Sequence, residues 1–339
     1  MTILFLGIDL AKNVFALHGV DERGKPALVR PAVRRDQLLE AVAKLPPCTI
    51  GMEACSGAHH WARRFQDFGH TVRLMAPKFV VPYRMSGRRG KNDAADAAAI
   101  CEALQQRPAM RFVPVESTQA QSRLAVHTAR QGWVSARTAV INRLRGVLSE
   151  FGIVLPLKAA TVRSRAGEQI DTVPGWVQTV CRDLLAELQR LDERVAAYDE
   201  HIRLMAQADD RARALMAMPG IGPTTASALL ASIGYGHDFA NGRQLAAWMG
   251  LAPGQYSSGG KNRLGRITKA GDAYLRTLFI MGARAVLAAA ANKHDRLSRW
   301  ATALAERRGY WKAVVAIAAK NVRMAWAMLA KGEEFKPMA

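Results

Sequence analysis

The chain has 339 residues, 50% of them hydrophobic, which is enough for roughly two globular domains with real cores and excludes a disordered chain. Forty-eight Lys and Arg residues against 28 Asp and Glu residues leave a formal charge of +20. This excess of cations favours a polyanionic partner, nucleic acid before an anionic membrane. No run of about 18 apolar residues and no basic signal segment are found, so we expect a soluble, cytoplasmic protein without a membrane partner.

The first 112 residues alternate short apolar segments with helical ones. Strands are predicted near 3–10, 14–20 and 27–29, the first two as a hairpin, and further strands over 48–53 and 71–75. Helices are predicted over 36–45, 58–68 and 93–105. This β-β-β-α-β-α-β-α order predicts an α/β domain with a mixed sheet over residues 1–112.

Four acidic residues of this domain stand where they can converge. Asp9 and Glu53 each end a predicted strand, and Asp93 and Asp96 are one helical turn apart, with Cβ atoms about 5–6 Å from each other. Carboxylates in this arrangement can bind one or two Mg²⁺ ions, one activating the attacking oxygen and the other stabilising the leaving oxygen. Taken singly, each acid also fits a simple strand end or helix cap.

A basic, glycine-containing loop leads into the helix of Asp93. Its cations, with no acid between them, are Arg84, Arg88, Arg89 and Lys91. A solvated loop would explain them, but beside a metal site on a strongly basic chain we expect contact with a nucleic-acid strand.

Residues 113–213 are predicted to form long helices. Apolar residues recur at heptad spacing, namely Leu184, Leu188, Leu191, Val195, Tyr198 and Ile202. The surrounding residues 182–203 are rich in acids, against the trend of the chain. We therefore expect a coiled coil for self-association, with a helical hairpin inside one chain as the alternative.

Residues 214–339 are predicted to form an all-α domain, with long helices over 273–291, 294–307 and 310–329. The segment 218–226 matches a helix-hairpin-helix, in which Gly220, Gly222 and Thr224 open a helix whose free amides can bind a phosphate. A plain turn between two helices is the alternative.

A second glycine-rich segment, residues 255–266, combines hydroxyl groups with cations. Ser257 and Ser258 precede two glycines, and the cations that follow are Lys261, Arg263, Arg266 and Lys269. By itself this is a phosphate-binding loop whose serines donate hydrogen bonds.

The segments Gly7-Ile8-Asp9, Met52-Glu53-Ala54 and Asp93 to Asp96 resemble the acidic tetrad of RuvC-like nucleases. Nearly the whole chain resembles the insertion-sequence transposases related to pilin-gene invertases, which include the bridge-RNA-guided recombinases. The resemblance implies an RNase H-like N-terminal domain and a tetrad of Asp9, Glu53, Asp93 and Asp96. It also implies that Ser258, rather than Ser257, is a nucleophile that forms a covalent phosphoserine link to cleaved DNA.

Partners follow from the same resemblance. They are double-stranded donor and target DNA, a structured bridge RNA that selects the sites, and further copies of the chain in a homodimer or homotetramer. The protein would act at the nucleoid of a prokaryote. Because a serine needs activation, we expect the serine and the metal site to form one composite active site.

Three other interpretations stay open. A RuvC-like Holliday-junction resolvase would use the tetrad with water as nucleophile, and a non-catalytic scaffold would use the basic surface alone. The segment from Gly7 to Lys12 also resembles the first phosphate hairpin of actin-like ATPases and sugar kinases, but the later glycine-rich loops that those proteins need are not evident.

Overall fold

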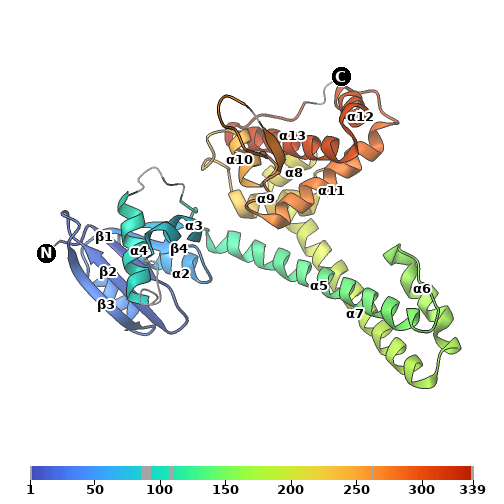
Figure 1. Ribbon diagram of the computed structural model, residues 1–339, viewed down its shortest axis with the longest axis horizontal. Helices are drawn as coiled ribbons and strands as arrows, with labels where there is room; N and C mark the ends of the chain where they lie inside the picture. Colours follow the sequence, from blue (N-terminus) through green and yellow to red (C-terminus); the bar gives the residue numbers. More distant parts are fainter. Residues whose placement is uncertain (1, 85–92, 107–109, 111, 262, 337–339) are drawn as a thin grey trace. The chain divides into compact units, whose positions relative to one another are not determined.

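The computed structural model describes residues 2–84, 93–106, 110, 112–261 and 263–336 (Figure 1). Arg88, Arg89 and Lys91 therefore lie outside the described residues. The chain forms two compact units, Met1–Ser117 and Thr118–Ala339. The boundary that the sequence predicts near residue 213 stays a prediction.

A five-stranded mixed sheet forms the centre of the first unit (Figure 1). Its strands are β1 (Phe5–Asp9), β2 (Val14–Val20), β3 (Pro26–Arg34), β4 (Thr49–Glu53) and β5 (Thr71–Met75), in the order β3-β2-β1-β4-β5. Neighbours among β1, β2 and β3 are antiparallel, whereas β4 is parallel to both β1 and β5. The predicted mixed sheet is confirmed.

Helices cover both faces of this sheet. The helices are α1 (Leu38–Ala43), α2 (Ala58–Asp67), α3 (Pro77–Val80) and α4 (Asp93–Gln106), with a 3₁₀ turn at Val81–Tyr83. Trp61 and Phe65 of α2 share one core with Ile8, whereas Ile100 and Leu104 of α4 belong to a second core. Successive residues of a strand point to opposite faces, so β1 presents Ile8 to one core and Gly7 to α4.

The second unit begins with a long helical hairpin. It consists of α5 (Thr118–Ser149), α6 (Ala159–Gln169), a 3₁₀ turn at Ile170–Thr172 and α7 (Gly175–Gln207). Leu184, Leu188 and Leu191 of α7 share a core with Leu144 and Leu148 of α5. The heptad seam is thus covered within the chain, as in the alternative left open by the sequence, and self-association stays a prediction.

The acids of α7 have intramolecular partners as well. Arg130 of α5 contacts Asp199 at 2.5 Å, and Arg137 contacts Asp192 at 3.3 Å. Arg194 lies over the Trp133 ring, 4.7 Å from its centroid. The acidic bias of residues 182–203 therefore complements the arginines of α5 in the same chain.

Six helices form the rest of the second unit around the largest core: α8 (Asp210–Met216), α9 (Pro223–Ile233), α10 (Gly242–Trp248), α11 (Ala273–Ala290), α12 (Arg296–Arg308) and α13 (Tyr310–Lys331). The expectation of an all-α domain is wrong, because β6 (Pro253–Gln255) and β7 (Leu264–Ile267) form a two-stranded sheet. These strands have three and four residues and each contains a glycine, so they lack the alternating pattern that reveals a strand.

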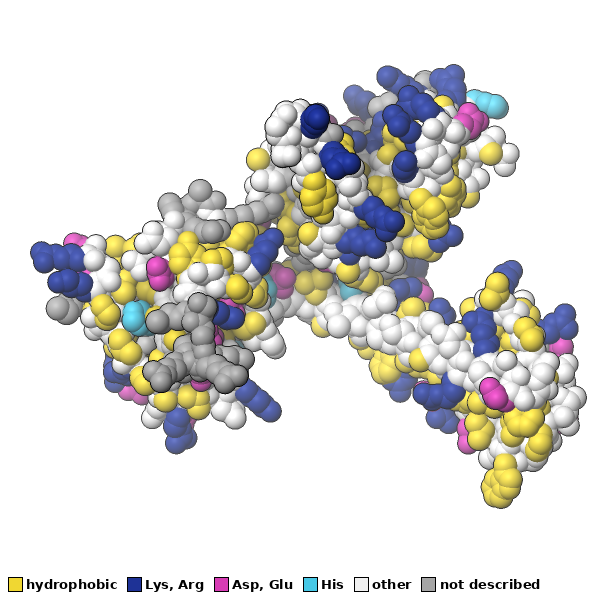
Figure 2. Space-filling view, viewed as in Figure 1, with side chains coloured by type: hydrophobic (Ala, Val, Ile, Leu, Met, Phe, Trp, Pro, Cys, Tyr) yellow, Lys and Arg dark blue, Asp and Glu magenta, His cyan; other side chains and the backbone are white. Residues whose placement is uncertain are grey.

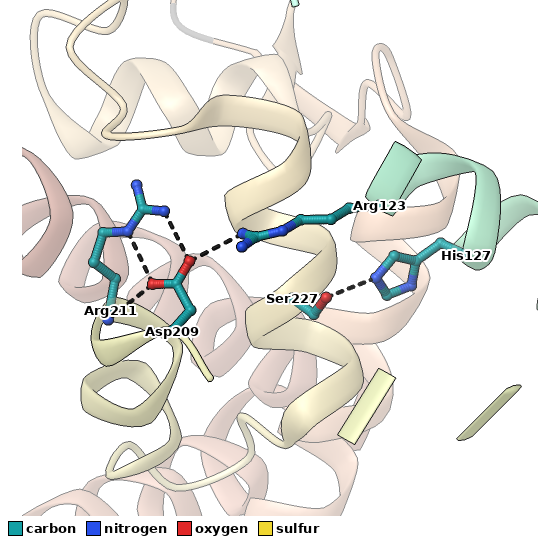
Figure 3. A network of polar contacts seen from close by, with 5 residues as sticks. All are labelled: Arg123, His127, Asp209, Arg211 and Ser227. Carbon is teal, nitrogen blue, oxygen red and sulfur yellow. Dashed lines mark hydrogen bonds and ion pairs between the residues drawn. The ribbon is translucent and has the colours of Figure 1, made fainter. Parts of the chain in front are cut away.

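A polar network ties the first turns of α5 to the helices beside it (Figure 3). Asp209, the N-cap of α8, accepts hydrogen bonds from Arg123 at 2.9 Å and Arg211 at 2.8 Å. The buried His127 ring lies 3.1 Å from both the Ser227 hydroxyl of α9 and the Tyr274 hydroxyl of α11.

Within the described residues, α11 and α13 are long and apolar enough to cross a membrane by length and composition alone. The core helices of soluble proteins have the same composition. Phe279 of α11 and Ile317 of α13 lie in the largest core of the second unit, so each helix packs part of its apolar surface there.

Candidate active site

The carboxyl ends of β1 and β4 bring two of the predicted acids together. Asp9 is the last residue of β1 and Glu53 the last of β4. The strands are parallel and neighbouring, with Ile8 beside Met52, so both acids leave the sheet at the same edge. Both are partly buried.

The other two acids come from the first turn of α4, which begins at Asp93 and includes Asp96. Close packing fixes this helix over β1. A Cβ atom built on Gly7 would stand 2.3 Å from the Ala97 carbonyl oxygen and 2.6 Å from the Cys101 nitrogen. Glycine at position 7 is therefore needed for α4 to approach the strand that carries Asp9.

The four acids affect one another electrostatically. Partial burial and, after it, the charges of Asp96, Asp93 and Glu53 raise the pKa of Asp9 to about 6. Burial is also the main reason that the pKa of Glu53 is raised. Carboxylates that raise the pKa of a neighbouring acid would be stabilised by a bound cation.

Arg84 supplies part of that positive charge. Its guanidinium lies 3.0 Å from Glu53 through Nη2 and 3.0 Å from Asp96 through Nε. Arg84 also lowers the pKa values of Asp9 and Glu53, against the effects that raise them. Arg84 therefore bridges acids from β4 and α4, and the nucleic-acid contact expected for it stays a prediction.

The donor set can be compared with what a metal ion requires. Among the described residues, no group of three or more His, Cys, Asp or Glu side chains is close enough together to hold a metal ion. The four carboxylates nevertheless suit a hard divalent cation, and Arg84 stands where positive charge is needed. The residue types fit a divalent ion, which would be held by Asp9, Glu53, Asp93 and Asp96 and would supply the positive charge that Arg84 gives to Glu53 and Asp96.

The predicted helix-hairpin-helix lies between α8 and α9. Gly220 has φ +81°, and a Cβ there would stand 2.7 Å from the Gly282 carbonyl oxygen of α11. Gly222 is the N-cap of α9 and has no side chain to cap the helix. A Cβ at this position would meet nothing within 4 Å. Gly220 thus serves packing, while Gly222 and Thr224 flank an N-terminus whose first amides point out of the helix.

Ser258 lies at the tip of the β6–β7 hairpin. Gly259 and Gly260 have φ +55° and +76°, and the Lys261 amide donates to the Ser258 carbonyl at 3.1 Å. Two central residues with positive φ make a type I′ turn, which matches the twist of a hairpin. Both serines are exposed, and the Ser257 hydroxyl accepts a hydrogen bond from Gln255 at 2.9 Å.

The cations predicted around Ser258 are exposed on the same segment. Lys261, Arg263, Arg266 and Lys269 form no ion pair within the part of the chain that the structure describes. Lys269 has φ +54°, and its amide donates to the Gly250 carbonyl at 3.1 Å. Lys269 follows β7, and this hydrogen bond ties it to the segment between α10 and β6.

Comparisons with known proteins agree with both parts of this arrangement. Residues 6–153 match a transposase model of the DEDD type, and residues 212–298 match the model described as "Transposase IS116/IS110/IS902 family". A probable family 20 transposase of Pseudomonas aeruginosa is 45% identical over 99% of this chain and 100% of its own length. The chain belongs to the IS110 family of transposases. The transposase of insertion sequence IS1111A from Coxiella burnetii is 40% identical over 98% of this chain and 92% of its own length.

As an IS110 family transposase, the protein is an enzyme that cleaves DNA strands, and its DEDD domain implies use of a divalent metal. Sequence reasoning missed two features of this transposase. One is Arg84, which bridges two acids. Arg84 follows the 3₁₀ turn at Val81–Tyr83, and its spacing from Glu53 and Asp96 in the sequence does not predict that it contacts them. The other is Cys55, a residue on the surface beside the acids. Partial desolvation of its thiol and, after it, the charges of Glu53 and Asp9 raise the pKa of Cys55.

Proposed function

We propose that this transposase cuts and rejoins DNA strands with Mg²⁺ held by Asp9, Glu53, Asp93 and Asp96 and with Ser258 as a covalent nucleophile. The observation that carries the proposal is geometric: Asp9 and Glu53 leave the sheet at one edge, and Arg84 bridges Glu53 to Asp96 of α4 at 3.0 Å each. Four carboxylates from two strands and one helix would hold one or two ions. Bound Mg²⁺ would polarise the phosphodiester and stabilise charge on the leaving oxygen.

The sheet supports an RNase H-like fold for the first unit. Three antiparallel strands are followed by parallel ones, and the acids leave β1 and β4 at one edge, opposite the first turn of α4. This topology fits the fold that the resemblance to RuvC-like nucleases implies.

The serine step is a transesterification. The Ser258 Oγ forms a bond to phosphorus, the bond from phosphorus to a deoxyribose oxygen breaks, and the hydroxyl proton passes to a base. The departing oxygen takes up a proton and becomes a free hydroxyl. One phosphodiester is exchanged for another, so a second hydroxyl can reverse the step and join a new strand without external energy.

The position of Ser258 supports this role over one for Ser257. Both serines are exposed and close to the cations in sequence, but Ser258 directly precedes the Gly259-Gly260 turn, whereas the Ser257 hydroxyl accepts a hydrogen bond from Gln255. A turn of defined geometry presents a side chain more reproducibly than an irregular loop. Lys261, Arg263, Arg266 and Lys269 would hold the phosphates on either side, and Gly222 and Thr224 would bind a phosphate at the N-terminus of α9.

The same proposal includes the partners that the resemblance implies. Double-stranded donor and target DNA would be recognised with the help of a structured bridge RNA, and a homodimer or homotetramer would bring two DNA duplexes together. The high positive charge suits several polyanions at once. Native mass spectrometry with and without RNA measures both the oligomer and the RNA stoichiometry.

A denaturing gel tests the mechanism. The transposase is incubated with Mg²⁺, RNA from its own element and end-labelled donor DNA, and we expect a protein–DNA adduct that survives denaturation. Ser258→Ala and Asp9→Ala should each remove the adduct while nucleic-acid binding survives, and Ser257→Ala is the matched control that keeps it. Cleavage without an adduct would favour a resolvase that uses water. A non-catalytic scaffold would bind nucleic acid but would show no Mg²⁺ binding that depends on Asp93 and Asp96.

A further inference from the structure

Two large aromatic side chains lie exposed at the corner between α12 and α13. Trp311 is 63% exposed and Tyr310 is 43% exposed, and their ring centroids are 5.2 Å apart. Gly309, with φ +86°, ends α12 and begins α13, so the chain turns sharply just before the two rings. Tryptophan and tyrosine contribute most to binding free energy when a partner covers their rings, and both of these rings have exposed surface.

One cation lies against the Trp311 ring, and three more flank the two aromatic residues in the sequence. Arg307 and Arg308 end α12, Lys312 follows Trp311, and the Arg284 guanidinium of α11 lies 5.7 Å from the centroid of the Trp311 ring. We call these four cations with Tyr310 and Trp311 the aromatic-basic surface. None of the four forms an ion pair among the residues that the structure describes. Figure 2 shows Lys and Arg side chains gathered over the part of the second unit that α12 and α13 occupy.

The local charge identifies the kind of partner. Between residues 296 and 312 there are five cations, Arg296, Arg299, Arg307, Arg308 and Lys312, and one acid, Glu306. An apolar protein partner would meet unpaired guanidinium groups here, whereas a polyanion would neutralise them. Charge complementarity therefore points to nucleic acid.

The aromatic rings decide which form of nucleic acid fits. In a duplex the bases are stacked on one another and their faces are not available to side chains. An unpaired base can stack on an exposed aromatic ring while its phosphate contacts a neighbouring cation. We propose that the aromatic-basic surface binds unpaired nucleotides of a single-stranded segment, with Trp311 as the stacking platform and Arg307, Arg308 and Lys312 holding the backbone.

This surface is separate from the features used in the proposed function. It contains none of the tetrad acids, the β6–β7 hairpin or the α8–α9 turn. A loop of the guide RNA and a melted strand of DNA share the chemistry that it recognises. The source is therefore decided by experiment.

Fluorescence anisotropy with labelled oligonucleotides about 15 nucleotides long tests the proposal. Oligothymidylate, oligouridylate and a DNA duplex of equal length are titrated with the full chain carrying Asp9→Ala, which prevents cleavage. We expect Trp311→Ala to weaken binding of the single strands about fivefold or more and to leave duplex binding unchanged. Trp311→Phe keeps an aromatic ring and should restore most of the affinity.

Trp176→Ala is the matched control, because Trp176 is 88% exposed and lies at the start of α7. It should not change binding of any ligand. Combined replacement of Arg307 and Arg308 by alanine should weaken binding of all three ligands and reduce its salt dependence, because those residues contact phosphates. Tighter binding of oligouridylate would indicate RNA as the source, and tighter binding of oligothymidylate would indicate melted DNA.

Single-strand affinity in Trp311→Ala equal to that of the Trp176→Ala control would overturn the proposal. So would an equal loss on duplex and single strands, or a change of oligomeric state without a change in oligonucleotide binding. Thermal unfolding of each variant verifies that the fold is kept. Failure of the serine mechanism would appear in the adduct gel instead and would leave these affinities unaffected.

Discussion

The backbone of Ala97 lies so close to Gly7 that a Cβ at position 7 would stand 2.3 Å from the Ala97 carbonyl oxygen. Helix α4 and strand β1 therefore meet backbone to backbone. This contact places the Asp93 turn against the end of β1, where Asp9 lies. The position of Asp93 and Asp96 relative to Asp9 therefore depends on glycine at position 7.

Gly7→Ala should therefore both destabilise the first unit and weaken the metal site. We expect a loss of about 1–3 kcal/mol in the free energy of unfolding, because the nearest atoms are backbone and cannot rotate away. Gly51→Ala is the control, since its Cβ would meet the flexible end of Met75 at 3.0 Å. Urea unfolding and a Mn²⁺ titration measure the two effects, and equal behaviour of the two variants would contradict this interpretation.

Arg84→Ala should increase the affinity for a divalent metal. The guanidinium competes with the cation for Glu53 and Asp96, so its removal frees both carboxylates and leaves their repulsion uncompensated. Arg84 is partly exposed, so we expect a several-fold effect, about 1 kcal/mol. Isothermal titration with Mn²⁺ measures it.

Arg64→Ala is the matched control for Arg84, because Arg64 forms a surface ion pair with Asp67 at 3.7 Å on α2. It should leave the metal affinity unchanged. A weaker metal site in Arg84→Ala would mean that Arg84 orients the acids and does not compete with the ion.

Metal affinity should rise as pH is raised through about 6. The pKa of Asp9 is raised to about 6 by burial and then by Asp96, Asp93 and Glu53, with Arg84 acting against them. Below that pH the carboxyl is protonated and a metal ion must displace the proton; above it the carboxylate is free to bind. Asp9→Asn should weaken binding and flatten this pH profile, and an unchanged profile would remove Asp9 from the metal site.

The second unit should lose stability as pH falls from 6.5 to about 4. Burial, and to a lesser extent the charge of Arg130, lowers the pKa of His127 from 6.5 to about 4. In this window the unfolded chain binds a proton that the folded chain does not, so acid favours unfolding by up to about 3 kcal/mol. His127→Gln should flatten the pH dependence of thermal unfolding, while replacement of the exposed His237 by Gln should not.

Replacing Gly259 and Gly260 by alanine should reduce the covalent adduct without unfolding the second unit. Both positions have positive φ, and we expect a cost of about 1 kcal/mol at each. The hairpin is exposed, so the cost affects the presentation of Ser258 and not the helical core. Gly254→Ala is the control, because its Cβ would meet nothing closer than 3.7 Å. Normal adduct formation in the double variant would show that the turn geometry is not required.

The sequence predicted the first unit well because its patterns are local. Strand Thr71–Met75 was predicted at the residues where the structure has it, and Asp93 and Asp96 lie on α4 as predicted. Asp9 and Glu53 each end a predicted strand, which suggested that they converge, and the parallel pairing of β1 with β4 brings their carboxyl ends to one edge. The Arg84 bridge depends on tertiary geometry, which local patterns do not contain.

The second unit shows where sequence patterns become ambiguous. The heptad of α7 correctly indicated a helix–helix seam, but a seam within one chain and a seam between two chains have the same sequence pattern. The hairpin of β6 and β7 was missed because glycine, proline and cations dominate it. Its Gly259-Gly260 pair was interpreted as part of a phosphate-binding loop, although two adjacent glycines also fit a tight hairpin turn.

The pairing of α5 with α7 makes the hairpin a spacer of defined length. At 1.5 Å per residue, the 32 residues of α5 extend about 48 Å. Removing seven residues from each helix would keep Leu184, Leu188 and their partners in register and shorten the spacer by about 10 Å. A partner bound at the far end of the hairpin would thus be held at a distance that changes in steps of one heptad. Recombination measured for hairpins of different length would show whether this distance must match the DNA.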